Sequence, residues 1–589
     1  MPRSRPGRGT ARYLHGTTGR WLAIFGVSLG LLLIRFLVPT PVGQADNRDG
    51  PRLMCGLGLA KVVPPGQPVF FRYAYFEYLT SPGCVGRSPY PSSEIVPLEV
   101  ARGLTPVFGL PGDLNLIALG VLMCILTSVA IASLATGLRI KLWAQLLVAA
   151  AVWLIIADSA FFDVFASPFS EGSALVGLLL VAAGVLYLRR GWRETVFGLV
   201  LAGSGGFLAI LSKEQYMVLA LPICVTLVLA TAGRGRWRGL RRFRDREATA
   251  GVVVAAGLAL MAGVYALWDY TSRYGQRLHH IQAVDMIFTD IVTSRSAAPA
   301  QLRAIGLPVS WARYAGHYYW DRTSIRLSPL YSHYVGRLTD QNIVHYLLTH
   351  PRYILSVGQS AAIFAQQFRT TQLGDYPISA GQPKGAYESR VVVVTWLIHQ
   401  LPANLGLWLY VPLWIAMSGI GLIALYMGRA RAWHRGGAVL VLCMTGCAFV
   451  AFIPPAYFAG ISTTRHMVGA NLATALAFTT SVALAISLIQ QALTRGRRPA
   501  ALGHQGRGRP DGRGQSGTAT ITSDALITAT TSRPSARPSS RAASTVMEAT
   551  SRTPFASSTT FAVASPAVTP VTVALIWLRA LSCMYVVLS

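Results

Sequence analysis

The sequence predicts an all-α, polytopic membrane protein with about ten transmembrane helices, two large outer loops and a disordered C-terminal tail. Of its 589 residues, 52% are hydrophobic and only 13% are charged, whereas a soluble globular protein carries about 25% charged residues. The hydrophobic residues lie in runs long enough to cross a hydrocarbon core of about 30 Å. These two observations exclude an ordinary cytosolic enzyme, a disordered chain and a coiled coil.

Ten apolar runs are the candidate transmembrane helices. In chain order they are 21–38, 114–135, 142–158, 173–188, 195–212, 215–232, 250–268, 404–427, 437–455 and 467–489. The first run is longer than the apolar region of a usual signal peptide, and no clear cleavage site follows it. We therefore expect a retained first helix whose Arg35 reaches the membrane interface. The segment 391–401 is too short to cross and is either re-entrant or an eleventh, partial helix.

The basic residues orient the chain. With a cytoplasmic N-terminus, the inside segments are 1–20, 136–141, 189–194, 233–249 and 428–436, and they hold 20 basic and three acidic residues. The two long loops between the other helix ends are closer to charge balance, as expected for the outside. The dense arginine run within 233–249 favours contact with anionic lipid headgroups over nucleic-acid binding. We expect a multi-pass protein of the cell (plasma) membrane.

This topology divides the chain into five parts. They are a basic cytoplasmic N-terminus (1–20), an N-terminal transmembrane core (21–268) with a first outer loop (39–112), an outer loop or ectodomain (269–390), C-terminal transmembrane helices (391–489) and a low-complexity tail (490–589). The tail is rich in Arg, Ser, Thr, Ala, Gly and Pro, which is typical of disorder. Cys55 and Cys84 are the only cysteines expected outside, either as a disulfide or as two free thiols.

Five carboxylates lie at the predicted outer mouths of helices. They are Asp113, Asp158, Asp163, Glu171 and Glu214. A carboxylate near a membrane is costly unless it faces water, a partner or a substrate. As a group these residues indicate an outward-facing polar cavity; the alternative for any one of them is that it caps a helix.

Two further sets of charges face the same side. Asp46 and Asp49 follow the first helix directly and lie three residues apart, a pattern that suits a general base and a second orienting or cation-binding carboxylate, although Asp and Gly also form turns. Lys213 and Arg465 are cations at outer positions, against the positive-inside trend. We expect each to bind an anion, either a lipid phosphate or a nearby carboxylate.

The pattern resembles the GT-C superfamily of polytopic membrane glycosyltransferases, and within it the bacterial hexose transferases of surface-glycan biosynthesis. The segments that carry this resemblance are ADNRDGPRLM (45–54), DVFASPFSEG (163–172), SKEQY (212–216), HIQAVDMIFTDI and LRAIGLPVSWARYAGHYYW (280–320), HPRYI (350–354) and TTRHM (463–467). The family's acidic pair is often contiguous, whereas here two residues separate the aspartates.

The resemblance implies transfer of a hexose from a polyprenyl-phosphate donor to a cell-surface glycan or lipid-linked acceptor on the outer face. Asp49 or Asp46 would be the general base, and Lys213 and Arg465 would neutralise the departing lipid phosphate. Other expected substrate or phosphate contacts are Arg48, Asp163, Glu171, Glu214 and His466. A divalent cation, Mg²⁺ or Mn²⁺, is used by some members and stays open here.

A transporter or flippase of lipid-linked glycans is the main alternative, and a polysaccharide polymerase is another. Transporters often show internal repeats and charged helices near the midplane of the membrane. This sequence has no evident repeat, and its carboxylates gather at one face. The sequence therefore favours an enzyme that acts on lipid-linked sugars in the membrane and binds no nucleic acid.

Overall fold

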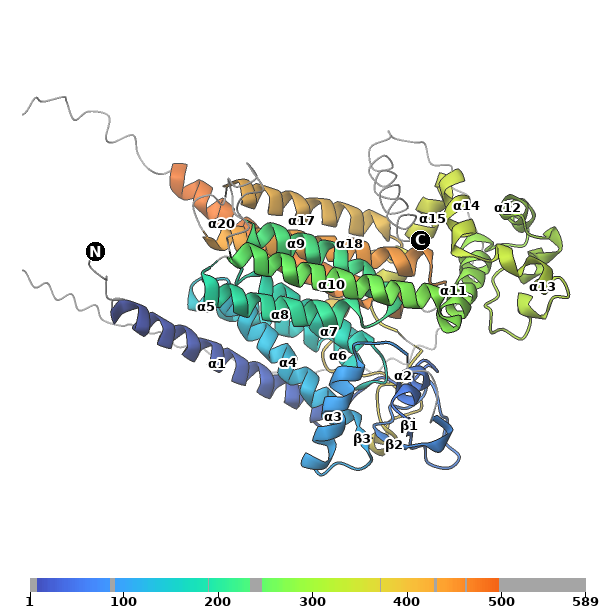
Figure 1. The fold of residues 1–589 in the computed structure, drawn as a ribbon, viewed down its shortest axis with the longest axis horizontal. Helices are drawn as coiled ribbons and strands as arrows, with labels where there is room; N and C mark the ends of the chain where they lie inside the picture. The colour runs from blue at the N-terminus through green and yellow to red at the C-terminus, as the bar shows by residue number, and fades with distance from the viewer. Residues whose placement is uncertain are drawn as a thin grey trace, which may run out of the picture. The chain divides into compact units, whose positions relative to one another are not determined.

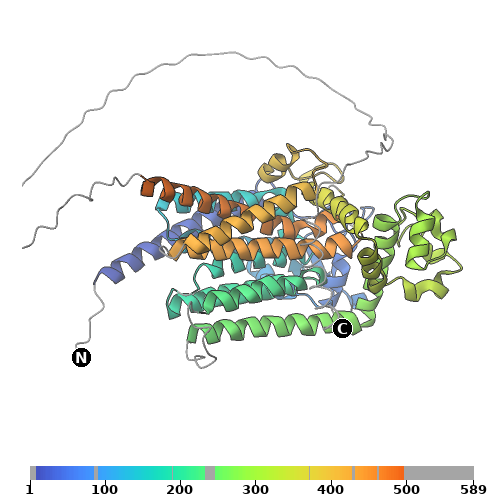
Figure 2. The same ribbon diagram turned by 90° about the horizontal axis from the view of Figure 1, so that it is seen from above.

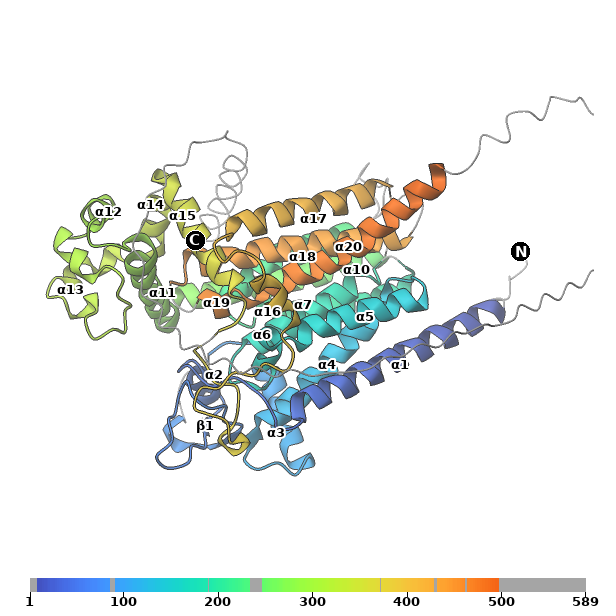
Figure 3. The same cartoon turned by 180° about the vertical axis from the view of Figure 1, so that it is seen from behind.

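The computed structural model describes residues 8–84, 90–188, 190–232, 246–370, 372–427, 432–460 and 463–496. The predicted low-complexity tail beyond residue 496 and most of the arginine run of 233–249 lie outside these residues. Within them the chain is mostly helical, and the long helices run side by side as a bundle (Figure 1, Figure 3).

Each of the ten predicted apolar runs forms a helix of this bundle. The helices are α1 (Arg8–Leu37), α4 (Leu116–Gly137), α5 (Leu142–Ala157), α7 (Glu171–Val185), α8 (Trp192–Ile210), α9 (Ala220–Thr231), α10 (Arg246–Thr271), α17 (Leu407–Met427), α18 (Ala432–Tyr457) and α20 (Val468–Gly496). The helical multi-pass fold class is confirmed.

The ten helices are not all of full spanning length. Among the described residues, eight helices are long and apolar enough to cross a membrane. A ninth span exists only if α5 is joined to α6 (Ser159–Phe162) and the 3-10 turn that follows, across a 65° bend. The tenth helix, α7, has 15 residues, all of them buried. Its neighbours in the bundle, and not lipid, satisfy its apolar surface.

Helices α7 and α8 approach each other through paired glycines. A Cβ atom on Gly177 would lie 2.5 Å from the carbonyl oxygen of Gly205, and one on Gly184 would lie 2.5 Å from the carbonyl oxygen of Gly198. Small residues at a helix interface let two backbones come close inside a membrane. We call these two pairs the glycine seam. It fixes the separation of two helices that each end beside the site described below.

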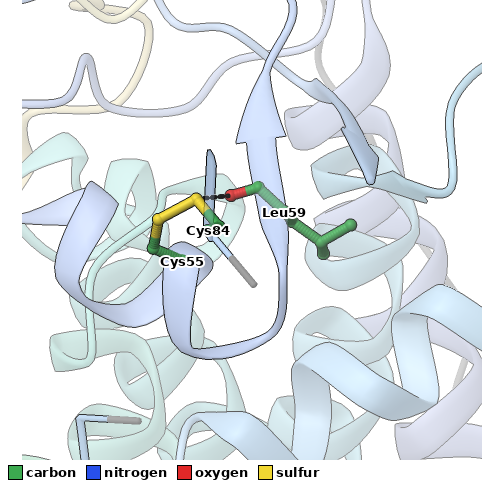
Figure 4. The surroundings of a disulfide bond; sticks show 3 residues. All are labelled: Cys55, Leu59 and Cys84. Carbon is green, nitrogen blue, oxygen red and sulfur yellow. Dashed lines mark hydrogen bonds between the residues drawn. A yellow bond between two sulfur atoms is a disulfide. The ribbon is translucent and has the colours of Figure 1, made fainter. Parts of the chain in front are cut away.

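The first long loop folds into small elements at one end of the bundle, the loop end. They are α2 (Gly50–Gly56), β1 (Leu59–Lys61), β2 (Glu77–Thr80), α3 (Ile95–Val107) and β3 (Leu114–Asn115). The strands form an antiparallel sheet in the order β1-β2-β3, which the sequence analysis did not predict. Cys55 and Cys84 form the disulfide that we considered, next to the carbonyl of Leu59 (Figure 4).

The second long loop is helical and lies at the same end of the bundle (Figure 1, Figure 2). Its helices are α11 (Arg273–Asp285), α12 (Ala298–Ile305), α13 (Tyr331–Tyr334), α14 (Asp340–Thr349) and α15 (Pro351–Gln366). The prediction that a helix begins at Pro351 is confirmed, as expected for proline in a first helical turn.

The segment 391–401 contains only the seven-residue helix α16 (Val393–His399). The Asp158 carboxylate, at the end of α5, accepts hydrogen bonds from the Thr395 backbone N–H (2.9 Å) and hydroxyl (2.6 Å). The segment is therefore a short helix fastened to the end of α5. Asp158 caps helices, as the alternative interpretation stated, and does not line a cavity.

Residues 372–391, which we call the strap, join the two long loops through their backbones. The N–H of Gly43 donates to the backbone carbonyl of Asp375 (3.0 Å), and the N–H of Ala45 donates to the backbone carbonyl of Gly374 (2.8 Å). On the other side, Gly374 N–H donates to the carbonyl of Phe71 (3.0 Å). The strap thus holds the segment that leads from α1 to the acidic turn at 46–49.

Candidate active site

Five segments far apart in the sequence meet in one pocket at the loop end. They are the start of α2, the segment before α3, the start of α7, the turn between α8 and α9, and the short helix α19 (Thr463–His466). The pocket has a volume of about 30 Å³ and is lined by Asp49, Arg52, Leu53, Tyr90, Pro168, Phe169, Ser170, Glu171, Lys213, Glu214 and Arg465. Three cations and three carboxylates therefore face one another in a small volume.

Arg465 lies at the centre of this arrangement. Its guanidinium forms an ion pair with Asp49, and its Nε lies 3.5 Å from Oε1 of Glu171. The ring of Phe169 lies under it, with 4.6 Å between Cζ and the ring centroid. The side chain is only 3% exposed. Burial alone would lower the pKa of Arg465, but Glu171 and Asp49 outweigh it and raise the pKa, so the cation stays charged.

Lys213 and Glu214 place a second cation and carboxylate beside it. The Lys213 ammonium lies 3.2 Å from Glu171, so Glu171 faces both Lys213 and Arg465. Glu214 accepts a hydrogen bond of 2.5 Å from the Tyr90 hydroxyl. The turn that carries Lys213 and Glu214 follows α8, and Glu171 is the first residue of α7, so the glycine seam sets the distance between these charges.

Asp49 is the carboxylate of the pocket that reaches solvent. Its side chain is 31% exposed, and Arg52, one helical turn later, lies 3.4 Å from it. Burial would raise the pKa of Asp49, but Arg465, Lys213 and Arg52 outweigh this effect and lower the pKa well below its usual range. Asp49 is therefore ionised and surrounded by cations, and part of its side chain is open to solvent.

Asp46, the other predicted base, lies outside the pocket. It is buried, and its Oδ2 lies 2.6 Å from the Lys61 ammonium. Its Oδ1 accepts the N–H groups of Arg48 (2.8 Å) and Gly50 (3.0 Å), the two residues that flank Asp49. A Cβ on Gly50 would lie 2.9 Å from the Asp46 carboxyl carbon, so only glycine permits this turn. In this geometry Asp46 shapes the turn that presents Asp49.

Arg48 and His466 also lie beside the pocket and not in its lining. Arg48 has a left-handed backbone (φ 89°), and its guanidinium lies over the rings of Phe70 and Phe71. His466 is buried, and its Nε2 lies 3.4 Å from Nη2 of Arg465. Burial, then Lys213 and Arg465, hold the pKa of His466 well below its usual range, so its imidazole is neutral.

Asp163 belongs to a separate ionic cluster. Its carboxylate lies 3.9 Å from Arg35 and 3.4 Å from Arg369. Arg35 forms an ion pair with Glu388, and Arg369 forms one with Asp375, both on the strap. Arg35, predicted to reach the membrane interface, is only 3% exposed, because the strap brings Glu388 to it. The cluster fastens the strap to α1.

The remaining predicted acid, Asp113, also lies outside the pocket. Its carboxylate accepts the N–H and the hydroxyl of Thr80, each at 2.6 Å, at the end of β2. Of the nine predicted site residues, the pocket lining brings together Asp49, Glu171, Lys213, Glu214 and Arg465.

The sequence analysis missed Arg52 and Tyr90 as lining residues. Arg52 had a usable signal, since a helix that begins after Asp49 places residue 52 on the same face. Tyr90 had none, because no pattern links it to Glu214. Among the described residues, no three or more His, Cys, Asp or Glu side chains group as metal ligands. Asp46 and Asp49, considered as a metal pair, face different cations.

Residues 12–496 match the family model described as the YfdI N-terminal transmembrane domain. The matched range includes every residue that lines the pocket. The chain matches no curated protein and no protein of solved structure.

Proposed function

Because the chain belongs to the YfdI N-terminal transmembrane domain family, we propose that this multi-pass membrane protein is a glycosyltransferase. The family is associated with glycan-modifying membrane proteins. The proposed reaction moves a hexose from a polyprenyl-phosphate donor to a glycan or lipid-linked acceptor outside the cytoplasm. The observation that carries the proposal is the convergence of Arg465, Lys213 and an exposed Asp49 carboxylate in one pocket at the end of a membrane bundle.

The two cations suit the phosphate of the donor. In the proposed reaction, the headgroup of the donor lipid binds at Arg465 and Lys213, at the end of the membrane bundle. Nη1 of Arg465 is buried and has no hydrogen-bond partner among the described residues, so it can donate to a phosphate oxygen. Negative charge grows on the leaving phosphate in the transition state, and fixed cations stabilise that charge more than the ground state.

Asp49 suits the role of general base. The acceptor hydroxyl gives its proton to Asp49, and its oxygen forms a bond with the anomeric carbon of the hexose. The bond between that carbon and the phosphate oxygen breaks, and its electron pair leaves with the lipid phosphate. A phosphate at Arg465 competes with Asp49 for the guanidinium. Loss of this ion pair raises the proton affinity of Asp49, as a general base requires.

The orientation of the pocket is part of the proposal. Disulfides persist in oxidising compartments, and the Cys55–Cys84 bond lies at the loop end. The short connecting segments at the opposite end of the bundle, 136–141, 189–194, 233–249 and 428–436, hold 15 basic and only three acidic residues, as expected for the cytoplasmic side. A reporter fused after residue 240 should therefore be active only in the cytoplasm. A signal from the external side would place the pocket in the cytoplasm and contradict the proposal.

The catalytic test uses purified protein, a polyprenyl-phosphate hexose and an acceptor. We expect Asp49→Asn to lower the transfer rate by about 10²- to 10⁴-fold, the usual contribution of a general base. Arg465→Lys should also lower it, because an ammonium cannot reproduce the fork of donors. Asp113→Asn is the matched control, since Asp113 lies at the same end outside the pocket, and it should transfer at the wild-type rate.

The proposal fails if Asp49→Asn, folded as shown by an unchanged melting temperature, transfers hexose as fast as the wild type. It also fails if the protein moves the intact donor across a vesicle bilayer without any acceptor and Asp49→Asn keeps that movement. That result would favour a transporter of lipid-linked sugars.

A further inference from the structure

Residues 298–338, which we call the lobe, form a second charged surface that the proposed reaction does not use. The lobe contains α12, α13 and the turns between them, and α11 and α14 lie between it and the bundle (Figure 1, Figure 2). It stands beyond the ends of the spanning helices, along their common direction.

The lobe has a small core of its own. Trp311 is fully buried and donates a hydrogen bond of 3.0 Å from Nε1 to the Ser328 hydroxyl. Its ring packs against Tyr334 and Phe288, with centroids 5.6 and 6.3 Å away. The N–H of Tyr319 donates to the Asp285 carboxylate at 2.5 Å, which ties the lobe to α11. The outer side chains of the lobe are thus carried by a backbone that this core and the hydrogen bond to Asp285 hold in place.

The outer surface of the lobe is both cationic and aromatic. Between 298 and 338 the chain has five arginines and one carboxylate, Asp321, and all five arginines are exposed. Trp320 is 49% exposed and Tyr318 is 42% exposed. The guanidinium of Arg326 lies 5.5 Å from the centroid of the Trp320 ring. Flat apolar rings and guanidinium groups therefore lie side by side on one exposed segment.

This combination fits a negatively charged sugar chain. An aromatic ring offers an apolar face to the C–H face of a sugar, and an arginine binds a carboxylate or phosphate through two parallel N–H groups. The same residue types also suit an anionic membrane surface. However, the lobe lies past the helix ends, on the far side of α11 and α14, and so away from the bilayer that the helices cross.

We propose that the lobe binds an anionic polysaccharide, through Trp320, Arg326 and the neighbouring exposed arginines. The binding itself does not depend on the proposed function. The further step, that the bound polysaccharide is the acceptor and is held near the pocket while its end is glycosylated, rests on the proposed function. The lobe is then a second substrate site, separate from the Asp49 pocket, and it selects acceptors that carry carboxylates or phosphates.

The test measures binding of polygalacturonate oligomers to the full-length protein in phosphatidylcholine nanodiscs, with dextran as the neutral comparison. We expect polygalacturonate to bind, dextran to bind at least tenfold more weakly, and added NaCl to weaken the binding because exposed charges are screened. Trp320→Ala should weaken binding by about tenfold, the loss of one stacking contact. Arg326→Gln should weaken it comparably. Trp396→Ala and Arg277→Gln, exposed residues outside the lobe, are the matched controls and should bind as the wild type.

Three results would overturn the inference. The first is that polygalacturonate and dextran bind equally well, or that neither binds. The second is binding that survives both lobe substitutions. The third is a lobe-dependent attachment to phosphatidylglycerol vesicles that exceeds its affinity for the polysaccharide, which would assign the lobe to a membrane. The measurement needs no donor and no transfer, so a failure of the proposed glycosyltransferase reaction leaves it readable.

Discussion

Substitution within the glycine seam should disturb the pocket from a distance. In Gly177→Ala the new Cβ would lie 2.5 Å from the backbone oxygen of Gly205 and 2.6 Å from the backbone N of Ala209. Neither atom can move by a change of rotamer. Restoring an ordinary contact of 3.4 Å requires α7 and α8 to separate locally by about 0.9 Å.

The magnitude follows from two opposing terms. Alanine stabilises a helix by about 1 kcal/mol over glycine, whereas overpacking costs about 1–3 kcal/mol. The control is Gly257→Ala on α10, where an added Cβ meets nothing within 4 Å. Because both variants gain the same helix propensity, their difference in stability isolates the overpacking and should be about 1–3 kcal/mol.

A second control separates stability from activity. Gly184→Ala meets Gly198 at the same 2.5 Å and should cost the same stability. Gly177 lies six residues from Glu171, about 9 Å along the helix, whereas Gly184 lies about 20 Å away. A displacement near 1 Å at reacting groups can cost about 10²-fold in rate. Gly177→Ala should therefore lose transfer activity, and Gly184→Ala should lose much less.

The assays are the melting temperature in detergent and the rate of hexose transfer at a temperature where all variants are folded. The reasoning is refuted if Gly177→Ala matches Gly257→Ala in both stability and rate. Equal losses of rate in Gly177→Ala and Gly184→Ala would show that the loss does not depend on the distance from Glu171, against the reasoning.

Two further predictions concern charges outside the pocket. Lys61→Met leaves the buried Asp46 carboxylate without its cation and should destabilise the protein by about 3–5 kcal/mol. The melting temperature should recover in part when Asp46→Leu is added. A Lys61→Met protein as stable as the wild type would contradict this prediction. In His279, burial lowers the pKa, but hydrogen bonds of 2.8 Å to Asp269 and Asp340 outweigh it and raise the pKa to about 10. Because this value exceeds that of the unfolded chain, about 6.5, the stabilisation is complete below about pH 6.5 and is lost as the pH rises towards 10. The melting temperature of the wild type should therefore fall towards that of His279→Gln over this interval, and parallel profiles would refute the assignment.

The sequence predicts the bundle well because a membrane helix is a long run of apolar residues, which composition alone shows. It does not distinguish α7 from the lipid-facing helices, because α7 is as apolar as its neighbours, and only packing shows that its 15 residues are surrounded by protein. The extent of an apolar run reports how hydrophobic the surroundings are. It does not say whether those surroundings are lipid or other helices.

The candidate site could be predicted only in part. Asp46 and Asp49 have the same side chain and lie three residues apart, so their roles cannot be separated by residue type. The structure separates them through Lys61 on β1, 15 residues after Asp46, and through Arg465, 416 residues after Asp49. Which cation pairs with which carboxylate is decided by the tertiary structure, and the local sequence around the two aspartates does not show it.

The backbone pairing of the strap has a consequence for biogenesis. Residues 43–45 emerge from the ribosome long before residues 374–375, to which they bond. The turn that presents Asp49 therefore lacks this support until the strap has been synthesised and exported. A nascent chain that has inserted only its first seven helices lacks both the strap and Arg465. The pocket should thus be completed late in synthesis, and under the proposed function an incomplete chain would transfer no sugar.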